Sequence, residues 1–564
     1  MAVPQETGQR AISTARQVLG ALIAAGIRDL VISPGSRSAP LAYAAAEAEA
    51  AGILRLHVRI DERSAAFVAL GLSQASGLPV AVAATSGSAI GQMLPAVMEA
   101  NHTAAALLVL SADRPDELLG TGASQSTTQK NLFGPHVRAA LNVVAGTDPS
   151  AAVAQAVAAL RGGTVPPGPV QLNLQFRDPL TPEDHAQLAG QEWTRIQPGT
   201  WGSAAPAAAW EDNGGGAEHR TVVVAGHGAG SQAQAFARAQ GLPLFAEPSS
   251  NARFSANAIG HYRPLLAVGH QHIERVVLFG RPTLSRPVGR LLADPRIETA
   301  IWEPSPAAWY EPGRRRETPI SDPQILAQFA GTAPAGWLQA WQELDAQAQQ
   351  IRTTSSTSAS GLQGARVAEV LWEAELPMLL IGSSNIVRDF DLAAAPGPRQ
   401  PGRVFANRGL AGIDGTISTA LGLALASGER TVAVMGDITF AHDAGSMVWT
   451  KGEATPTLDV VVYNDQGGAI FSTLEHGAVH DSGRYERSVE RLFGTEQVMN
   501  IAALAEGYGW EYHRADTADG LAQLMEGSSP GALRVIEVPA SRAGLRAAHL
   551  ELNGRIAALS WPRG

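Results

Sequence analysis

Thr431-Val-Ala-Val-Met-Gly-Asp-Ile-Thr-Phe440 and Val460-Val-Val-Tyr-Asn-Asp-Gln-Gly-Gly-Ala-Ile-Phe471 are two apolar runs that each end in a polar turn containing glycine. Short β-branched runs bounded by turn residues predict buried strands. Asp437 ends the first predicted strand, and Asn464 ends the second, 27 positions later. That spacing accommodates one crossover between parallel strands, so we expect both side chains at the same edge of one sheet.

A divalent cation suits this pair of side chains. Mg²⁺ prefers oxygen ligands and takes few of them from protein, with water and phosphate supplying the rest. We predict Asp437, Asn464 and the backbone carbonyl of Gln466 as its protein ligands, with Mn²⁺ as an alternative ion. The competing interpretation is that Gly436-Asp437 is an ordinary turn, because aspartate is common in turns after strands.

The two turns together resemble the diphosphate-binding motif of thiamine-diphosphate enzymes. The resemblance rests on the spacing of Asp437 and Asn464 and on the apolar strand before each. The chain departs from the usual motif at two positions: Ile438 stands where a second glycine is common, and Tyr463 precedes the asparagine. Both proposed ligands are retained.

The rest of the chain repeats the pattern of strand and helix. Two stretches without hydrophobic periodicity, Pro198–Arg220 and Thr353–Gly364, predict linkers and divide the chain into residues 1–197, 198–360 and 361–564. In each part, β-branched runs alternate with alanine-rich segments, which is typical of parallel sheets with crossover helices. We therefore predict an α/β fold class with three open, doubly wound parallel-sheet domains. The expected strands are Leu30–Ser33, Leu54–Ile60, Val80–Thr85, Ala106–Ser111, Val170–Phe176, Thr221–Ala225, Leu242–Ala246, Val276–Phe279, Thr299–Trp302, Met378–Ile381, Arg403–Ala406, Thr431–Met435, Leu458–Tyr463 and Leu533–Val538.

Composition excludes several classes of function. A net charge of -10 argues against binding of nucleic-acid backbone, which needs a clustered cationic face. The one dense basic run, Arg314 to Arg316, is expected to be a solvated loop. The absence of cysteine excludes disulfides, thiolate metal sites and a cysteine nucleophile. Residues 1–10 lack a signal-peptide core and no apolar run reaches bilayer length, so we expect no membrane insertion and a cytoplasmic location.

A glutamate follows the strand expected over Leu54–Ile60. The chain continues as Asp61-Glu62-Arg63 into an alanine-rich segment, where Asp61 is a natural helix N-cap. Local sequence alone favours Glu62 as a first-turn acid stabilised by the helix dipole. The predicted metal site favours a catalytic interpretation, because thiamine chemistry needs one carboxylate against a pyrimidine nitrogen.

Nearly the whole chain resembles the 2-succinyl-5-enolpyruvyl-6-hydroxy-3-cyclohexene-1-carboxylate synthases, the carboligases of menaquinone biosynthesis. Besides the metal segment, the motifs that carry the resemblance are Ser33-Pro-Gly-Ser-Arg-Ser-Ala-Pro-Leu41, Asp61-Glu-Arg63, Thr85-Ser-Gly87, Ser111-Ala-Asp-Arg-Pro115, Asn407-Arg-Gly409 and Gly412-Ile-Asp-Gly415. The resemblance implies a pyrimidine-binding first domain, a central domain, and a third domain that binds diphosphate and Mg²⁺. It also implies a homodimer or homotetramer in which Glu62 and Asp437 serve one active site from different subunits.

The resemblance also implies contacts of individual residues. Glu62 would be catalytic. Thiamine diphosphate would be contacted by Thr85, Gly412, Ile413, Gly436, Asp437, Ile438, Thr439, Asn464, Gln466 and Ile470. The implied substrates, 2-oxoglutarate and isochorismate, are anionic, and arginine's planar fork suits their carboxylates. Substrate contacts would come from Arg37, Arg114, Ser124, Gln125, Arg286, Ser384, Arg388, Arg408, Phe471 and Leu474.

Each assignment has an ordinary structural alternative. The arginines could form surface salt bridges, and Ile470 and Phe471 could be plain core. Two other functions remain open: a related acetolactate synthase or 2-oxo acid decarboxylase, and a non-catalytic effector-binding protein on the same fold. A histidine-based zinc hydrolase is weaker, because His270 and His272 lack a clear third ligand.

Overall fold

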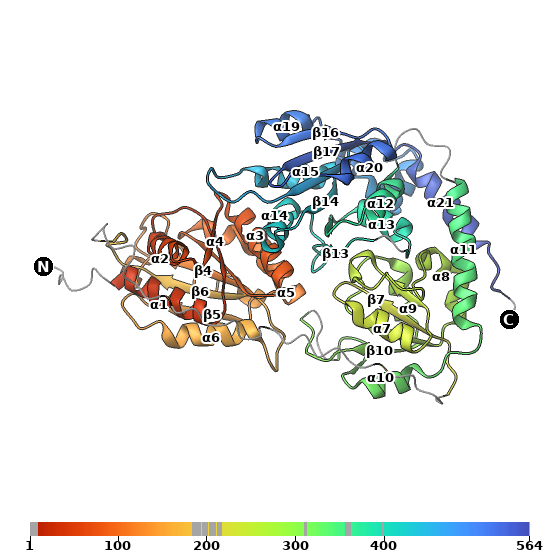
Figure 1. The fold of residues 1–564 in the computed structure, drawn as a ribbon, viewed down its shortest axis with the longest axis horizontal. Coiled ribbons are helices and arrows are strands. Elements are labelled where there is room, and N and C mark those ends of the chain that lie inside the picture. Colours follow the sequence, from red (N-terminus) through yellow and green to blue (C-terminus); the bar gives the residue numbers. More distant parts are fainter. Residues whose placement is uncertain are drawn as a thin grey trace, which may run out of the picture.

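Three lobes, each built on one parallel sheet with helices on both faces, make up the protein (Figure 1). The structure is a computed structural model that describes residues 10–182, 193, 201, 210, 217–308, 313–355, 363–397 and 400–562. The predicted α/β, doubly wound architecture is confirmed. The two predicted linkers lie largely outside the described residues, so the exact domain boundaries stay a prediction.

The first lobe contains six parallel strands. They are β1 (Asp29–Ile32), β2 (Arg55–Val58), β3 (Val80–Ala84), β4 (Leu107–Asp113), β5 (Ala139–Val143) and β6 (Val170–Gln175), in the spatial order β2-β1-β3-β4-β6-β5. One face is covered by α1 (Arg10–Ala24), α2 (Ala39–Ala50) and α6 (Ser150–Arg161), and the other by α3 (Glu62–Ser76), α4 (Ser88–Gln92) and α5 (Leu94–Thr103).

The middle lobe contains a smaller sheet of five parallel strands. They are β7 (Thr221–Ala225), β8 (Leu244–Ala246), β9 (Arg275–Phe279), β10 (Glu298–Trp302) and β11 (Thr318–Ile320), in the order β11-β10-β9-β7-β8. Its helices are α7 (Ser231–Ala239) and α10 (Pro323–Ala330) on one face, and α8 (Tyr262–Gly269), α9 (Arg286–Ala293) and α11 (Trp337–Ser355) on the other.

The last lobe repeats the strand order of the first. Its strands are β12 (Met378–Ile381), β13 (Arg403–Phe405), β14 (Thr431–Gly436), β15 (Leu458–Asn464), β16 (Glu511–Arg514) and β17 (Leu533–Pro539), in the order β13-β12-β14-β15-β17-β16. Its helices are α12 (Gly364–Glu373), α13 (Asn385–Ala393), α14 (Thr416–Ser427), α15 (Asp437–Asp443), α16 (Ala469–Thr473), α17 (Glu475–Asp481), α18 (Glu486–Val489), α19 (Ile501–Gly507), α20 (Ala518–Glu526) and α21 (Leu545–Ala557).

Every strand expected from the sequence is present, but three further strands were not anticipated. These three strands, β5, β11 and β16, each lie at the edge of a sheet. Most of their residues are exposed or half-buried, whereas the central strands β3, β4 and β7 are buried throughout. Edge strands carry little apolar periodicity, which is the signal that sequence analysis uses.

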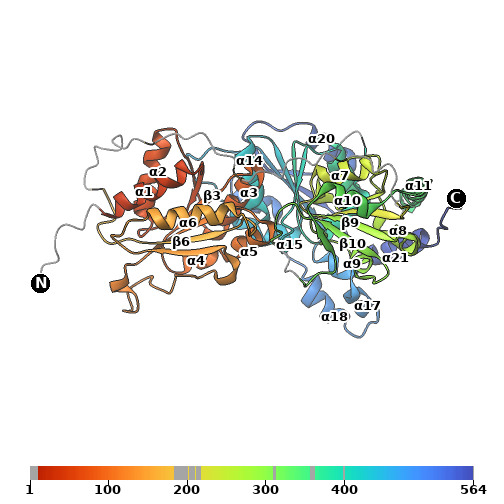
Figure 2. The same cartoon turned by 90° about the horizontal axis from the view of Figure 1, so that it is seen from below.

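The first and last lobes share one hydrophobic core, because α3 packs directly on α14 (Figures 1 and 2). Two glycines permit the close approach of the helices. A Cβ atom at Gly71 would lie 2.2 Å from the Thr419 carbonyl oxygen, and one at Gly422 would lie 2.1 Å from the Val68 carbonyl oxygen. The contact fixes the start of α3, where Glu62 lies, relative to the last lobe.

Two smaller expectations can be compared with the structure. In the basic run, Arg315 pairs with Glu317 at 2.6 Å, and Arg316 donates to the carbonyl of Ala293, the last residue of α9. Among the described residues, none of the helices combines the length and the apolar character that a membrane span requires.

Candidate functional site

The two strand ends predicted to hold a cation lie side by side. β14 and β15 pair in parallel, with Gly436 opposite Tyr463. Asp437 is therefore the first residue after β14, and Asn464 is the last residue of the neighbouring strand β15. The geometric part of the prediction is confirmed: both residues lie at the carboxyl edge of the same sheet, where open α/β folds bind ligands.

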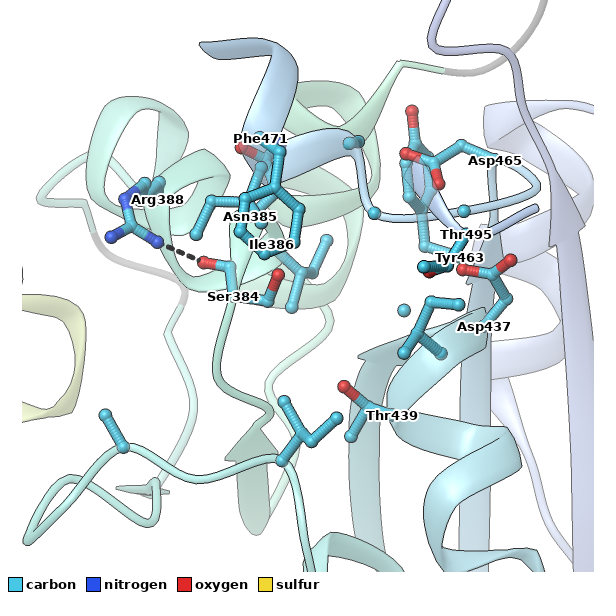
Figure 3. Close-up of a pocket in the computed structure, with 18 of the residues that line it drawn as sticks. Ser384, Asn385, Ile386, Arg388, Asp437, Thr439, Tyr463, Asp465, Phe471 and Thr495 are labelled. Carbon is cyan, nitrogen blue, oxygen red and sulfur yellow. Dashed lines mark hydrogen bonds between the residues drawn. The ribbon is translucent and has the colours of Figure 1, made fainter. Parts of the chain in front are cut away.

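A cavity of about 380 Å³ opens at this edge (Figure 3). It is bounded by the turns after β14 and β15, by the start of α13 and by the loop after β13. The predicted site residues that line it are Ser384, Arg388, Arg408, Ile413, Gly436, Asp437, Ile438, Thr439, Ile470 and Phe471. The structure thus collects at one place residues that are dispersed over about ninety positions of sequence.

Asp437 is the buried acid of this cavity. Its side chain is 2% exposed, and its Oδ1 atom has no hydrogen-bond partner within the described residues. Burial raises the pKa of Asp437 to about 6, although the backbone N–H groups of Ile438 and Gly467 donate to the carboxylate. A buried oxygen without a partner costs free energy, so the geometry fits a site that a cation completes.

Asp465 is a second buried acid at the same edge, and the sequence analysis did not single it out. Burial is the main cause that raises its pKa to about 8, and the neighbouring carboxylates of Asp437 and Asp389 add to the effect. Like charges at short range disfavour a second ionisation. A divalent cation would relieve this repulsion, which supports the same fit.

The other two predicted metal ligands are Asn464 and Gln466. The Asn464 side-chain amide donates to Glu537 at 2.7 Å, and its oxygen accepts from the Gln466 N–H at 3.3 Å. Gln466 has a φ of 60°, which is rare outside glycine, and its exposed side chain lines a neighbouring cavity. Their coordination of a metal stays a prediction.

Unusual backbone conformations occur at several residues of the cavity and of the predicted site. Besides Gln466, the non-glycine residues Gln125, Ser384, Ala411 and Thr495 have φ values of 53°, 90°, 59° and 43°. Ser384, Ala411 and Thr495 line the cavity, whereas Gln125 lies in the first lobe. Such conformations cost about 1–3 kcal/mol each and persist where the surrounding structure enforces them, often at functional sites.

Arg388 and Arg408 bring positive charge to the cavity without a carboxylate partner within the described residues. Arg388 lies one turn into α13 and donates to the Ser384 carbonyl at 2.6 Å. Arg408 donates to the hydroxyl and the carbonyl of Thr283 from the middle lobe, each at 3.0 Å. Burial, with repulsion between the two guanidinium groups, lowers the pKa of Arg388 to about 10. For these two arginines, the salt-bridge alternative does not hold.

The loop that carries Arg408 is held by Glu99 from α5. This buried carboxylate accepts the N–H groups of Gly409 and Leu410, both at 2.7 Å. Burial raises the pKa of Glu99, and the two backbone donors oppose that shift. A buried acid from the first lobe therefore positions a cavity residue of the last lobe.

Replacing Glu99 by glutamine is expected to weaken this support. An amide NH₂ group would face one of the two N–H donors, and an unsatisfied buried donor costs about 1–3 kcal/mol. We expect a lower thermal midpoint and a raised KM for the 2-oxo acid that the resemblance implies as substrate, with a smaller change in kcat. Thermal unfolding and steady-state kinetics measure both, with the exposed Glu429→Gln as control. Unchanged stability and KM in Glu99→Gln would contradict this role.

Five predicted residues of the first lobe form a separate cluster. Arg37 donates its backbone N–H to the Thr85 hydroxyl at 3.3 Å, and Arg114 donates to the Ser124 carbonyl at 2.6 Å. Gln125 approaches Gly87, which follows β3. The Nε atoms of Arg37 and Arg114 are buried without a partner among the described residues. Such donors suit an anionic ligand.

Glu62 begins α3, and the predicted N-cap is confirmed: the Asp61 carboxylate accepts the N–H groups of Arg63 and Ser64. Arg63 in turn contacts Asp443 at 3.3 Å, at the far end of α15 from Asp437. Asp437 and Asp443 are separated by roughly 9 Å of helix at 1.5 Å per residue. Glu62 is not among the residues that line the Asp437 cavity of its own chain.

Besides Gln466, three further predicted residues lie in neighbouring cavities. Gly412 lines a small cavity beside Glu99. Arg286 and Leu474 line a larger one that adjoins the Asp437 cavity, which Ile470 lines. The sequence analysis also missed the cavity residues Asn385, Tyr463 and Thr495 (Figure 3). Tyr463 was noted in the sequence only as a departure from the diphosphate-binding motif. The sequence around Thr495 contains no motif that indicates a site.

Comparison with known proteins agrees with this geometry. Residues 12–132 match the family model "Thiamine pyrophosphate enzyme, N-terminal TPP binding domain", and residues 389–536 match the corresponding C-terminal model. The chain is 53% identical to a 2-succinyl-5-enolpyruvyl-6-hydroxy-3-cyclohexene-1-carboxylate synthase of Paenarthrobacter aurescens (strain TC1), over 97% of each chain. It is 52% identical to the same-named protein of Arthrobacter sp. (strain FB24), over 97% of this chain and 92% of the relative.

A solved structure supports the fold alone. Benzoylformate decarboxylase from Polynucleobacter necessarius superposes with a TM-score of 0.63 at 15% identity, and the match covers 94% of this chain and 99% of that one. The three-lobed fold is therefore shared with a protein of distant sequence.

Proposed function

This chain belongs to the family of 2-succinyl-5-enolpyruvyl-6-hydroxy-3-cyclohexene-1-carboxylate synthases, and from that premise we propose the reaction and the residues that carry it out. It is a thiamine-diphosphate-dependent synthase of the menaquinone pathway. We propose that 2-oxoglutarate loses CO₂ and that its four-carbon succinyl fragment is added to a ring carbon of isochorismate. The observation that supports this most directly is the cavity that joins Asp437 to Arg388 and Arg408. Within the described part of the chain, one Asp437 oxygen has no hydrogen-bond partner and neither arginine has a carboxylate partner.

The last lobe would hold the diphosphate end of the cofactor. Asp437, Asn464 and the Gln466 carbonyl would hold Mg²⁺, and Gly436, Ile438 and Thr439 would lie against the diphosphate. Ile413 and Ile470 supply the apolar walls. When bound, thiamine diphosphate supplies a carbon nucleophile and an electron sink for decarboxylation. The protein supplies placement, exclusion of water and control of one proton.

Glu62 is the proposed proton-handling group. Its carboxyl would share a proton with a nitrogen of the cofactor's pyrimidine ring, and general acid–base groups contribute about 10²–10⁴-fold to rates. Thr85 lies in the same lobe, after β3. Both residues would therefore act on the pyrimidine end, opposite the diphosphate end.

The arginines would hold the substrates. Arg388 and Arg408 line the cavity and bring positive charge to it, and Ser384 and Phe471 line it beside them. Arg37, Arg114, Ser124 and Gln125 would approach from the first lobe. Guanidinium forks bind carboxylates in bidentate fashion, and both proposed substrates are carboxylates. An acidic protein needs this local concentration of positive charge to attract anions.

Two subunits would build each active site. Within one chain, Glu62 lies beside the far end of α15, away from the cavity of Asp437. A homodimer or homotetramer in which the first lobe of one subunit faces the last lobe of another would bring the two groups together. The proposed enzyme acts on small molecules, and we propose a cytoplasmic location for it.

A mixed dimer tests the two-subunit site. One subunit carries Glu62→Gln and a first affinity tag, and the other carries Asp437→Ala and a second tag. If sites lie between subunits, one site of the mixed dimer keeps both native residues, so roughly half the parental activity is expected. The two single-variant dimers serve as inactive controls. If each site lay within one chain, the mixed dimer would be as inactive as the controls.

Product identity tests the reaction itself. The purified protein with thiamine diphosphate and Mg²⁺ is given 2-oxoglutarate and isochorismate, and mass spectrometry is expected to show the tricarboxylic adduct and CO₂. Pyruvate in place of 2-oxoglutarate separates the acetolactate synthase and simple decarboxylase alternatives. Turnover of pyruvate with no adduct from 2-oxoglutarate would overturn the proposal, and absence of cofactor binding would favour the non-catalytic alternative.

A further inference from the structure

A buried polar cluster joins the start of α3 to the last lobe, where the two lobes meet (Figures 1 and 2). Its members are Ser64, Ser418, Asp443 and Ser446, which are between 0% and 4% exposed. Ser64 lies in the first turn of α3, two positions after Glu62. The other three come from α14, from the end of α15 and from the short 3₁₀ helix Ala444–Met447. None of these four side chains takes part in the proposed reaction.

Asp443 is the centre of this cluster. Its carboxylate accepts the Ser418 N–H at 3.0 Å and the Ser446 hydroxyl at 2.8 Å. The Ser446 oxygen in turn lies 2.7 Å from the Ser64 hydroxyl oxygen. Because a hydroxyl carries one hydrogen and Ser446 gives it to Asp443, the Ser64 hydroxyl donates to Ser446. Burial raises the pKa of Asp443, and its hydrogen-bond donors and the charge of Arg63 oppose that shift.

Arg63, the residue directly after Glu62, makes a second link to the same place. Its guanidinium lies 3.3 Å from the Asp443 carboxylate and donates to the His442 carbonyl at 3.2 Å. The Arg63 side chain is 22% exposed and that of Asp443 is fully buried, so salt screens this pair less than a surface pair. Two successive residues after Glu62 are therefore tied to the end of α15.

The strand that leads into Glu62 is also held by the last lobe. Glu453 accepts the N–H group of Val58, the last residue of β2, at 3.0 Å. The buried Arg59 guanidinium lies over the Trp449 ring, 4.0 Å from its centroid, and 3.8 Å from the Glu453 carboxylate. The last lobe therefore holds the chain on both sides of Glu62.

These polar contacts add something that the packing of α3 on α14 does not supply. Apolar contacts are non-directional, whereas hydrogen bonds prefer particular distances and angles. A buried polar network whose members all have partners makes the structure around it rigid. Within the described part of the chain, the Glu62 carboxylate has no hydrogen-bond donor of its own. Its place therefore depends on the backbone of the first turn of α3.

We propose that Asp443 and Ser446 are positioning residues for Glu62. Through Arg63 and Ser64 they hold the first turn of α3 in the orientation that proton transfer requires. This role rests on the proposed function, in which Glu62 shares a proton with the pyrimidine ring. A misplacement of about 1 Å can cost about 100-fold in rate, even when the altered residue is far from the reacting atoms.

The combined variant Arg63→Gln and Ser64→Ala tests the proposal in the full-length protein with thiamine diphosphate and Mg²⁺. The two changes detach α3 from the cluster and leave the Asp61 cap in place. We expect kcat to fall by about tenfold to 100-fold, with cofactor affinity close to that of the parent. Hydrogen exchange measured by mass spectrometry should be faster in the peptide that contains the start of α3. This second measurement requires no turnover.

A double-mutant cycle with Glu62→Gln shows whether the effect acts through Glu62. In the Glu62→Gln background, the same two changes should lower kcat by about twofold at most, because the group that they position is absent. Equal losses in both backgrounds would overturn the proposal, and so would parental kcat in the combined variant. If Glu62→Gln alone kept parental kcat, the proposed function would fail, and the single variant shows this separately.

Ser446→Ala is a second test that changes no residue of α3. It should speed hydrogen exchange at the start of α3 and lower kcat, and parental values of both would overturn the proposal. Ser76→Ala is the matched control, because Ser76 lies at the other end of α3 and its hydroxyl donates to the Leu72 carbonyl of the same helix at 2.7 Å. It should keep parental kcat and parental exchange at the start of α3.

Discussion

Glu62→Gln is expected to lower kcat by about 10²–10⁴-fold, which is the range that positioned acid–base groups contribute. The change removes the group that would share a proton with the pyrimidine ring and alters almost no volume. The N-cap of α3 comes from Asp61 and is untouched, so the helix should fold as before. The affinity for thiamine diphosphate should stay close to that of the parent, because Mg²⁺ and the diphosphate would bind in the last lobe.

Steady-state kinetics and cofactor titration together measure this prediction. The matched control is Glu486→Gln, which alters an exposed acid in the first turn of another helix, α18. Parental kcat in Glu62→Gln would show that Glu62 is only a first-turn acid favoured by the helix dipole. A parallel loss of cofactor affinity would instead indicate a binding role.

Asp437→Ala is expected to weaken Mg²⁺-dependent binding of thiamine diphosphate by on the order of 100-fold or more, because it removes the only carboxylate among the proposed ligands. The cofactor-free variant should remain folded. The Asp437 carboxylate is buried with one oxygen lacking a partner among the described residues, so its removal relieves an unsatisfied group. Stability without cofactor should therefore be equal to or above that of the parent.

Thermal unfolding with and without Mg²⁺ and thiamine diphosphate separates the two effects. A ligand that binds the folded state raises the midpoint, and this rise should disappear in Asp437→Ala. Asp516→Asn, at an exposed ion pair with Arg514, controls for loss of a surface charge. An undiminished, ligand-dependent rise in Asp437→Ala would remove Asp437 from the cofactor site.

The sequence by itself determined the central strands and the place where the site would form. Apolar runs such as 431–435 and 458–463 are buried on both faces, so they are visible without any knowledge of the fold. Parallel strands align their carboxyl ends, and this rule alone placed Asp437 beside Asn464. Asp61 could be identified as a cap because capping is a local interaction.

Only the tertiary structure decided which distant groups complete the site. Asp465 is buried by its surroundings, and Arg408 donates to the Thr283 carbonyl of the middle lobe. Glu99 of the first lobe accepts the N–H group of Gly409, in the loop that carries Arg408. These contacts join segments that are far apart in sequence. The separation of Glu62 from Asp437 within one chain follows from the packing of α3 on α14. Local patterns determine where strands and helices begin and end. Burial, charge pairing and cavity shape depend on which elements meet, and that information is not contained in any single stretch of the chain.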